Sequence, residues 1–260
     1  MAKYKFVQYS VENHIAEIVL DKPPLNLIDR ELTEDYFAAL DEADQDPEVR
    51  VIIVTGAGRG LSGGVDLKYI GDYGASEMRE FLSLFYIGMV KKVRGLTKPI
   101  LAAVHGFARE GACTIAFTCD MVVAADDATF GYPGVPNLAG PPGMHVWHLQ
   151  KLMGRMKAAE LIFTGDPIDA HEADKAGLVT KVVPRADLMD EARKLAARIA
   201  EMSPLALKNT RELFYRMEDM PFSQVPNTAL DALSLAFSSH DSKEARAAFN
   251  DKRKPVWQGK

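Results

Sequence analysis

The stretch RVIIVTGAGRGLSGGVDLK, residues 50–68, joins an apolar strand to a loop rich in glycine. Residues 50–55 are mostly β-branched and apolar, which is typical of a strand buried on both faces. In the loop, Gly63 and Gly64 permit backbone conformations that other residues rarely adopt. This order of strand and loop is the unit from which the fold class can be predicted.

The same unit repeats toward the C-terminus. A helical pattern over residues 77–94 precedes a second apolar strand at 99–104, and MVVAA at 121–125 indicates a third. Between them, HGFAREGAC leads into an apolar stretch. Strands that alternate with helices favour right-handed crossovers, so the sequence predicts an α/β fold with mainly parallel sheets.

The N-terminal part predicts a hairpin and a helix. Tyr4–Tyr9 and His14–Leu20 have the composition of paired strands on either side of a polar turn at Glu12 and Asn13. After a proline-rich loop, apolar residues recur at helical spacing over Glu31–Ala43, with Asp29 in position to cap the helix.

Beyond Met144 almost all periodic segments are helical. The clearest helical predictions are Leu188–Met202, Pro204–Met217 and Leu230–Phe249. We therefore predict a core domain over residues 1–200 and a C-terminal helical region over residues 201–260.

Composition excludes several classes of protein. The 260 residues are 47% hydrophobic and 26% charged, with a net charge of −5 and no blocks of basic residues. This balance does not indicate a basic surface that would bind nucleic acid or an anionic membrane. We see neither a membrane span nor a signal peptide, so we expect a cytoplasmic protein. Cys113 and Cys119 are expected to be buried core residues, with no disulfide and no metal site.

Five stretches, taken in order, resemble the crotonase (enoyl-CoA hydratase/isomerase) superfamily. They are GRGLSGGVDLK (58–68), KPILAAVHGFAREGAC (98–113), CDMVVAADDATFGYP (119–133), ELIFTGDPIDAHEADKAGLVTKVVP (160–184) and AAFNDKRKPVW (247–257). The resemblance covers nearly the whole chain. It implies the family's ββα spiral core and an acyl-CoA substrate bound by a homotrimer or hexamer. Coenzyme A would be part of the substrate, and no cofactor would be permanently bound.

The resemblance also implies an oxyanion hole, in which two backbone N–H groups hold the thioester oxygen as it gains enolate charge. By position these are the N–H groups of Val65 and Gly111. Gly111 begins the predicted apolar helix, whose free N–H groups favour an anion. The alternative is that these glycines only form turns. A Walker phosphate loop is excluded because no Gly-Lys-Ser/Thr follows.

Further positions correspond to the family's CoA-binding residues, the last two often contributed by an adjacent subunit. They are Lys22, Leu25, Leu27, Ser62, Gly63, Asp66, Leu67, Lys68, Phe249 and Lys252.

The sequence departs from the family at both catalytic glutamates. Thr114 and Gly134 stand where hydratases of this family have them, and neither residue is a general base near neutral pH. Glu110 is the nearest substitute carboxylate, or else an acid favourably placed at a helix N-terminus. Tyr132 and His145 are further catalytic candidates, or structural residues of their loops.

Three functions remain open at this point. The first is an acyl-CoA lyase or isomerase that stabilises a thioester enolate. The second is a hydrolase, decarboxylase or carbon–carbon lyase of the same fold. The third is an acyl-CoA-binding protein without catalysis. A Rossmann dehydrogenase does not fit, because the loop after residue 55 lacks a spaced GxGxxG and its ribose-binding acid.

Overall fold

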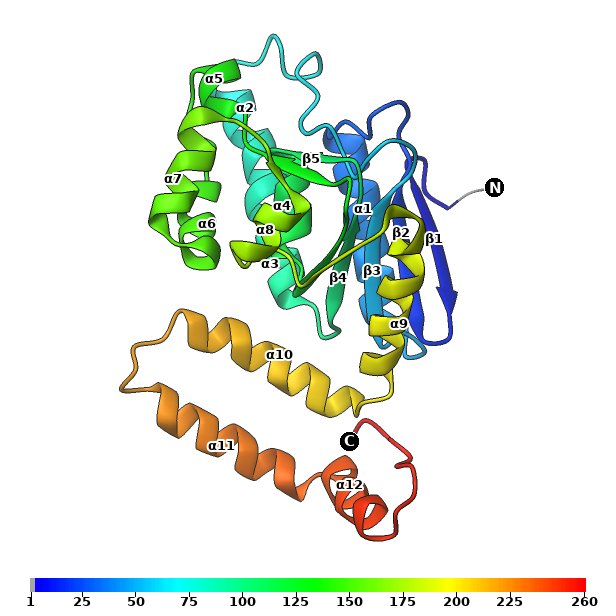
Figure 1. Ribbon diagram of the computed structural model, residues 1–260. Coiled ribbons are helices and arrows are strands. Elements are labelled where there is room, and N and C mark those ends of the chain that lie inside the picture. The colour runs from blue at the N-terminus through cyan, green and yellow to red at the C-terminus, as the bar shows by residue number, and fades with distance from the viewer. Residues whose placement is uncertain (1–2) are drawn as a thin grey trace.

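The structure is a computed structural model and describes residues 3–260. Its main sheet has six strands in the order β1-β2-β3-β4-β6-β9 (Figure 1). They are β1 (Val7–Glu12), β2 (Ile15–Leu20), β3 (Val51–Gly56), β4 (Ile100–Val104), β6 (Met121–Ala125) and β9 (Lys181–Val183). Strands β1 and β2 are antiparallel, and every other neighbouring pair is parallel. The prediction of a mainly parallel sheet is confirmed.

The N-terminal hairpin forms, but its turn lies one residue later than predicted. Val7 pairs with Leu20 and Glu12 pairs with Ile15, so Glu12 ends the first strand. Asn13 and His14 form the turn and both have positive φ angles, of 51° and 66°. A two-residue hairpin loop with two positive φ angles matches the right-handed twist of the strands beside it. The polarity of the residues alone does not show where such a loop lies.

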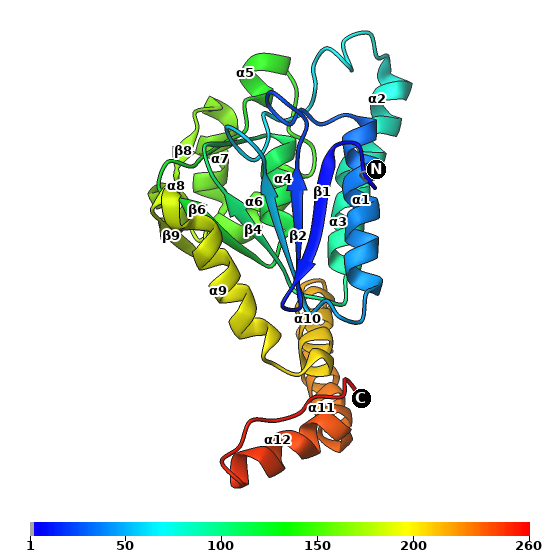
Figure 2. The same ribbon diagram turned by 90° about the vertical axis from the view of Figure 1, so that its right-hand side faces the viewer.

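Helices cover both faces of the main sheet (Figure 2). On one face α9 (Leu188–Ala200) packs on the side chains of Val51 and Ile53. On the other, Ile52 and Val54 belong to a core that includes α1 (Arg30–Gln45) and α4 (Gly111–Thr118). This alternation along β3 explains why its sequence is apolar throughout. Cys113 and Cys119 are buried as free thiols, as predicted.

Asp29 caps α1, as predicted, because its side chain accepts a hydrogen bond from the Leu32 N–H. The second predicted helix, over residues 77–94, is also present but is interrupted. It consists of α2 (Ala75–Leu82), a π-helical turn η1 (Ser83–Ile87) and α3 (Gly88–Gly95). Single π turns inside α-helices are frequent at functional sites.

A second, three-stranded sheet joins β5 (Phe107–Arg109), β7 (Thr129–Gly131) and β8 (Ile168–Asp169). The sequence did not predict this sheet, because strands of two or three residues are too short to show a period. Strands β8 and β9 both follow Met144, where almost only helices were expected. The helical elements between residues 134 and 187 are α5 (Gly134–Leu138), α6 (His145–Met153), α7 (Arg155–Thr164), α8 (Ala170–Lys175) and the 3-10 turn η2 (Arg185–Asp187).

Three helices form an arm that projects from the core (Figures 1 and 2): α10 (Pro204–Glu218), α11 (Val225–Ser238) and α12 (His240–Asn250). The predicted boundary at residue 200 falls at the end of α9. The single helix predicted over Leu230–Phe249 is wrong, because Ser239 is extended and caps α12 through its side chain. Arg211 attaches the arm to the core through an ion pair with Asp120, with a nitrogen–oxygen distance of 2.8 Å.

Candidate active site

Two glycine-containing loops lie side by side at one end of the sheet. The Leu61 N–H donates to the Phe107 carbonyl at 3.0 Å, and the Arg109 N–H donates to the Ser62 carbonyl at 3.2 Å. These bonds pair the loop after β3 with strand β5. As a result, segments far apart in the sequence place Val65 and Gly111 in one region.

The N–H of Val65 points away from its neighbouring strand. Ile28 pairs with this segment through the Gly64 carbonyl and the Asp66 N–H, at 2.8 and 2.9 Å, so the N–H between them faces the other side. Within residues 3–260, the N–H groups of Val65 and Gly111 donate no hydrogen bond to a protein acceptor. Val65 lines the cavity described below, and the buried Gly111 directly follows Glu110, which also lines it.

Both loops need glycine where they meet. Gly64 has a φ of +95°, and a Cβ atom there would lie 2.8 Å from the Arg109 carbonyl oxygen. A Cβ at Gly111 would lie 2.8 Å from the Phe85 ring and 2.9 Å from Ile28. A side chain at residue 64 would therefore force the two loops apart, and one at residue 111 would collide with Phe85 and Ile28.

Asn26 is a positioning residue that the sequence analysis did not single out. Its buried side-chain amide donates to the backbone carbonyls of Ala57, Gly60 and Leu61. The backbone carbonyl of Asn26 accepts from the Ser62 hydroxyl at 2.6 Å. The Ser62 oxygen in turn accepts from the Gly64 N–H at 3.1 Å. The only available signal was an asparagine in a proline-rich loop, which is enriched at a positive φ such as the 52° seen here.

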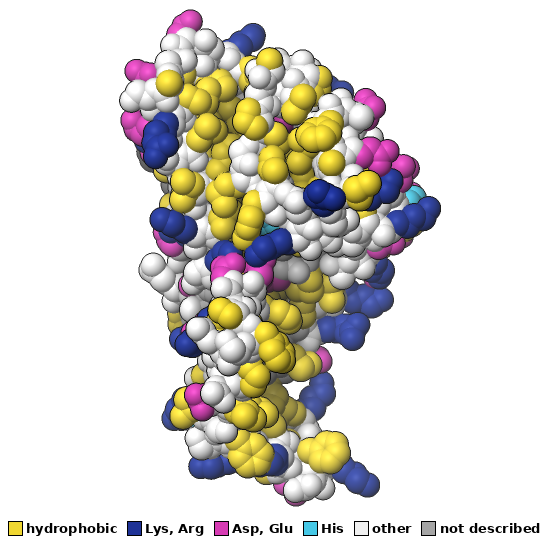
Figure 3. Space-filling view, turned by 90° about the vertical axis from the view of Figure 1, so that its left-hand side faces the viewer, with side chains coloured by type: hydrophobic (Ala, Val, Ile, Leu, Met, Phe, Trp, Pro, Cys, Tyr) yellow, Lys and Arg dark blue, Asp and Glu magenta, His cyan; other side chains and the backbone are white. Residues whose placement is uncertain are grey.

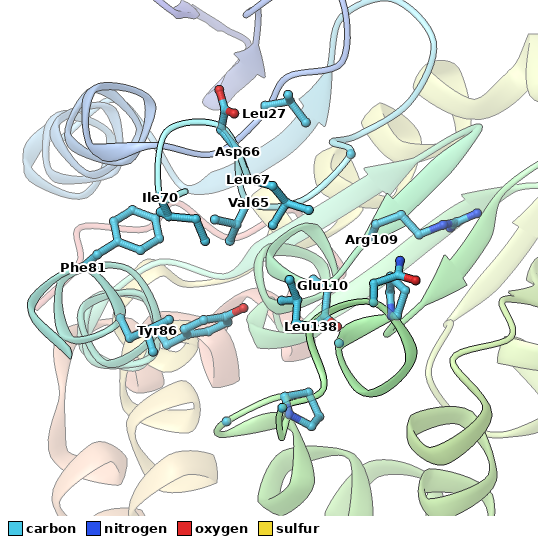
Figure 4. Close-up of a pocket in the computed structure, with 18 of the residues that line it drawn as sticks. Leu27, Val65, Asp66, Leu67, Ile70, Phe81, Tyr86, Arg109, Glu110 and Leu138 are labelled. Carbon is cyan, nitrogen blue, oxygen red and sulfur yellow. The ribbon is translucent and has the colours of Figure 1, made fainter. Parts of the chain in front are cut away.

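A cavity of about 1720 Å³ opens beside these loops (Figure 4). It runs between the 63–70 loop with α2 and η1 on one side, and residues 109–110, 133–144 and 164–167 on the other. Apolar side chains such as Ile70, Phe81 and Leu138 dominate its wall. The volume exceeds that of a pocket for a drug-sized molecule and suits a long ligand with an apolar end.

The predicted CoA-binding residues divide into three groups. Lys22, Leu27, Gly63, Asp66, Leu67 and Lys68 line the cavity. Leu25 and Ser62 lie behind it and hold the loop, since the Leu25 carbonyl accepts from the Gly63 N–H at 2.8 Å. Phe249 and Lys252 belong to the arm, where Phe249 is 85% exposed, and they do not line the cavity. Lys22 is already paired with Asp29.

Glu110 lines the cavity between the two predicted N–H donors, immediately before Gly111. Its backbone has φ 45° and ψ −106°, a conformation that a non-glycine residue adopts at a cost of about 1–3 kcal/mol. Although it precedes α4, its side chain makes no capping hydrogen bond. Glu110 therefore does not stabilise α4 through a side-chain capping hydrogen bond.

The Glu110 carboxyl group faces a poorly hydrated environment. Its Oε1 atom is buried and has no hydrogen-bond partner within the described residues. Burial raises the pKa of Glu110 to about 6, while the nearby Gly134 backbone N–H acts in the opposite direction. The hydroxyl of Tyr86, on η1, points toward the same part of the cavity (Figure 4). A carboxyl that titrates near neutral pH can both accept and donate a proton.

Thr114, Tyr132 and His145 form a cluster behind the cavity wall, where the His145 ring packs 5.3 Å from the ring of the cavity residue Tyr86. The Thr114 hydroxyl lies 3.0 Å from His145 Nε2, and the Tyr132 and His145 rings are 4.4 Å apart. Burial lowers the pKa of His145 to about 3, so its ring is neutral at ordinary pH. None of the three lines the cavity. Their catalytic roles remain predictions, and their contacts are those of packed interior residues.

No helix formed by residues 3–260 is long and apolar enough to cross a membrane. In the same part of the chain, no three His, Cys, Asp or Glu side chains come together as metal ligands would.

Known proteins resemble this chain over nearly its whole length. The profile of the enoyl-CoA hydratase/isomerase family matches residues 10–260. A probable enoyl-CoA hydratase of Mycobacterium tuberculosis is 34% identical over 97% of each chain. A crotonyl-CoA hydratase of Syntrophomonas wolfei is 32% identical over 96% of this chain and 97% of its own. An enoyl-CoA hydratase subunit from Geobacillus kaustophilus superposes with a TM-score of 0.92 at 34% identity, over 99% of this chain and 100% of its own. The predicted fold is confirmed.

Proposed function

Because the chain belongs to the enoyl-CoA hydratase/isomerase family, we propose that it acts on an acyl-CoA thioester whose carbonyl oxygen binds the N–H groups of Val65 and Gly111. One observation carries this proposal. Two backbone N–H groups from separate loops are left without protein acceptors beside one large apolar cavity. An arrangement of this kind suits an oxygen atom that gains negative charge during a reaction.

The reaction we propose is addition of water to an α,β-unsaturated acyl-CoA, or the reverse elimination. The oxygen of water adds to the β-carbon and one O–H proton passes to a base, the electron pair of the double bond moves toward the thioester oxygen, and a proton from an acid then reaches the α-carbon. Each N–H donor is worth about 3–4 kcal/mol to such an intermediate. Support for hydration comes from the named activity of the Syntrophomonas wolfei relative, a crotonyl-CoA hydratase.

We propose that the CoA portion lies beside Lys22 and Lys68, which both line the cavity. Lys68 would present its positive charge to the phosphate groups, and Lys22 would do so while paired with Asp29. The acyl chain would then extend past Val65 toward Phe81 and Leu138. This direction brings the thioester carbonyl to the paired loops.

We further propose that the chain works as a homotrimer or hexamer joined through the arm. Helix α11 has no buried residue, yet it carries Leu230, Leu233 and Phe237 at spacings that place them on one face. Figure 3 shows hydrophobic side chains exposed over the arm as well as over the upper part of the molecule. Exposed apolar area of this extent is typical of an interface between subunits. Phe249 and Lys252 would then reach a neighbour's cavity.

The reaction can be tested with a mixed panel of saturated, unsaturated, β-keto and malonyl-type acyl-CoAs, with every product followed by mass. We expect an unsaturated thioester to gain one water. Release of free CoA or of carbon dioxide would instead support a hydrolase or a decarboxylase. Binding of every thioester without any change in mass would support a protein without catalysis.

The oxyanion hole can be tested with Val65→Pro, which removes the N–H. The matched variant is Val65→Ala, which shortens the side chain but retains the donor. We expect V65P to be slower than V65A by about 100-fold or more. Thermal denaturation of both variants checks that each one is folded. Equal rates for the two folded variants would exclude Val65 as a donor.

A further inference from the structure

The Glu110 side chain and a side chain at residue 134 would compete for one space. A Cβ atom built on Gly134 would lie 2.6 Å from Glu110 Oε1 and 3.5 Å from its Cδ. A separation of 2.6 Å is well inside van der Waals contact. The carboxyl group therefore extends from the loop before α4 to the wall formed by the start of α5. It has room there because residue 134 is glycine.

Glu110 also lies beside both proposed donors. It directly precedes Gly111, and its Cβ is 3.6 Å from the point where a Cβ of Gly64, the residue before Val65, would stand. The α-carbon of a thioester is bonded to the carbonyl carbon, so a group that exchanges its proton has to lie close to the bound oxygen. Glu110 satisfies this condition. Of the other cavity carboxyls, Asp66 accepts hydrogen bonds from the Lys68 and Tyr69 N–H groups, and Asp166 is exposed.

We propose that Glu110 is the catalytic acid–base group that exchanges a proton with the α-carbon of the acyl-CoA, from a position made available by Gly134. This inference rests on the proposed function, which supplies the thioester and the two N–H donors. When the α C–H bond breaks, its electron pair enters the enolate and the proton moves to a carboxylate oxygen of Glu110. In the opposite direction the protonated carboxyl returns that proton to the α-carbon.

Three observations on Glu110 agree with this role. The residue keeps a backbone conformation suited to glycine, its Oε1 has no partner within residues 3–260, and its pKa is raised by burial into the range where a carboxyl transfers protons in both directions. A side chain kept only for packing would not need a carboxyl group with one buried oxygen left without a partner.

The first experiment measures exchange of the α-hydrogen of a saturated acyl-CoA with solvent deuterium, followed by mass, together with the Kd of the same thioester. Glu110→Gln retains the size of the side chain but cannot take up the proton. We expect E110Q to exchange at least about 100-fold more slowly, with a Kd within about three-fold of the wild type. The matched control is Asp174→Asn, a carboxyl-to-amide change at an exposed position of α8 outside the cavity, which leaves exchange within about two-fold.

A second experiment moves the carboxyl instead of deleting it. Glu110→Gly combined with Gly134→Glu presents a carboxyl to the same space from residue 134. We expect this double variant to exchange at least about ten-fold faster than E110G alone, with thermal denaturation showing that both are folded. A double variant no faster than E110G would overturn the assignment of this space to proton transfer.

The outcomes separate this inference from the proposed function. If the wild type binds acyl-CoA and exchanges the α-hydrogen, and E110Q exchanges within a few-fold of it, the inference is wrong and the proposed function stands. If the wild type neither binds nor exchanges any acyl-CoA, the proposed function fails and this inference fails with it.

Discussion

Glu110 and Gly134 are coupled by space: the carboxyl oxygen Oε1 of Glu110 stands 2.6 Å from the position that a Cβ atom of residue 134 would take. Residue 134 begins α5, whereas Glu110 precedes α4, so the two meet only in the folded chain. Any side chain at residue 134 must displace the carboxyl group. The relationship predicts non-additive effects of substitutions at the two positions.

The first prediction is a double-mutant cycle. Gly134→Ala should lower kcat/KM by about ten-fold or more in the wild type, because the added methyl group displaces the carboxyl from the α-carbon. In an E110G background the same change meets no carboxyl and should alter kcat/KM less than about two-fold. Steady-state kinetics of all four proteins measures the coupling, and equal effects in both backgrounds would show that the two residues act independently.

A second prediction concerns stability. Glu110→Gly should raise the free energy of unfolding by about 1–2 kcal/mol, since relief of a backbone conformation with φ 45° outweighs the greater entropy of glycine in the unfolded chain. E110Q retains the strained backbone and should not gain from this source. Denaturant titration of the three proteins tests the difference. A less stable E110G would mean that the conformation is not strained.

The third prediction is a pH dependence. Abstraction of the α-proton needs the carboxylate, so the exchange rate should rise as pH increases through about 6, the raised pKa of Glu110. The titratable groups that lie near it are Tyr86, Tyr132 and Cys113, and none should change charge in this range. Burial raises the pKa of both tyrosines, and it raises the pKa of Cys113 to about 12. Any residual exchange by E110Q should lack this step.

The free energy of unfolding should depend on the same ionisation of Glu110, but it should fall as pH increases, whereas the exchange rate rises. The folded pKa of Glu110 lies above its usual value of 4.5, so the fold favours the protonated carboxyl. Its stabilising contribution is present below pH 4.5 and is lost as pH rises through about 6. Relative to E110Q, the wild type should lose about 1 kcal/mol across this window, after allowance for partial exposure. A constant difference would indicate an ordinary pKa.

Thr114 gives the fourth prediction, because its hydroxyl is the hydrogen-bond partner of the buried His145 ring at 3.0 Å. Thr114→Val should lower the free energy of unfolding by about 1–3 kcal/mol, since it leaves Nε2 unpaired. Thr114→Ser retains the hydroxyl and is the matched control. Activity per folded molecule should change little, as Thr114 does not line the cavity. A loss near 100-fold in T114V at unchanged stability would place Thr114 in the chemistry.

The sequence predicted the elements whose signal is local. The apolar run of β3, the helical spacing of α1 and the cap at Asp29 all depend on neighbouring residues, and all three are present. Strand β8 has two residues and no period to detect. The break at Ser239 was missed because apolar residues continue at helical spacing on both sides of it.

The candidate site was predictable only in part for a related reason. Glycines at 63, 64 and 111 indicated closely approaching loops, and the structure brings those loops together. The loss of glutamates at 114 and 134 was visible, as was the acid at 110. The location of the Glu110 carboxyl beside Gly134 depends on the packing of α5 against the loop before α4. No pattern within one segment carries that information.

The last prediction concerns the arm, whose helix α11 exposes Leu230, Leu233 and Phe237 by 62%, 67% and 58%. We expect light scattering to give three or six times the chain mass of 28.6 kDa. Leu233→Asp should shift the mass toward the monomer, because an interface core does not accept an unpaired charge. Asp231→Asn changes the neighbouring residue, which is already polar and exposed, and should leave the mass unchanged. If Phe249 and Lys252 contact CoA across subunits, L233D should also raise KM for the thioester. A monomeric L233D protein with unchanged KM would instead place CoA binding within one chain. A wild type that is monomeric at assay concentration would rule out the arm as a subunit interface.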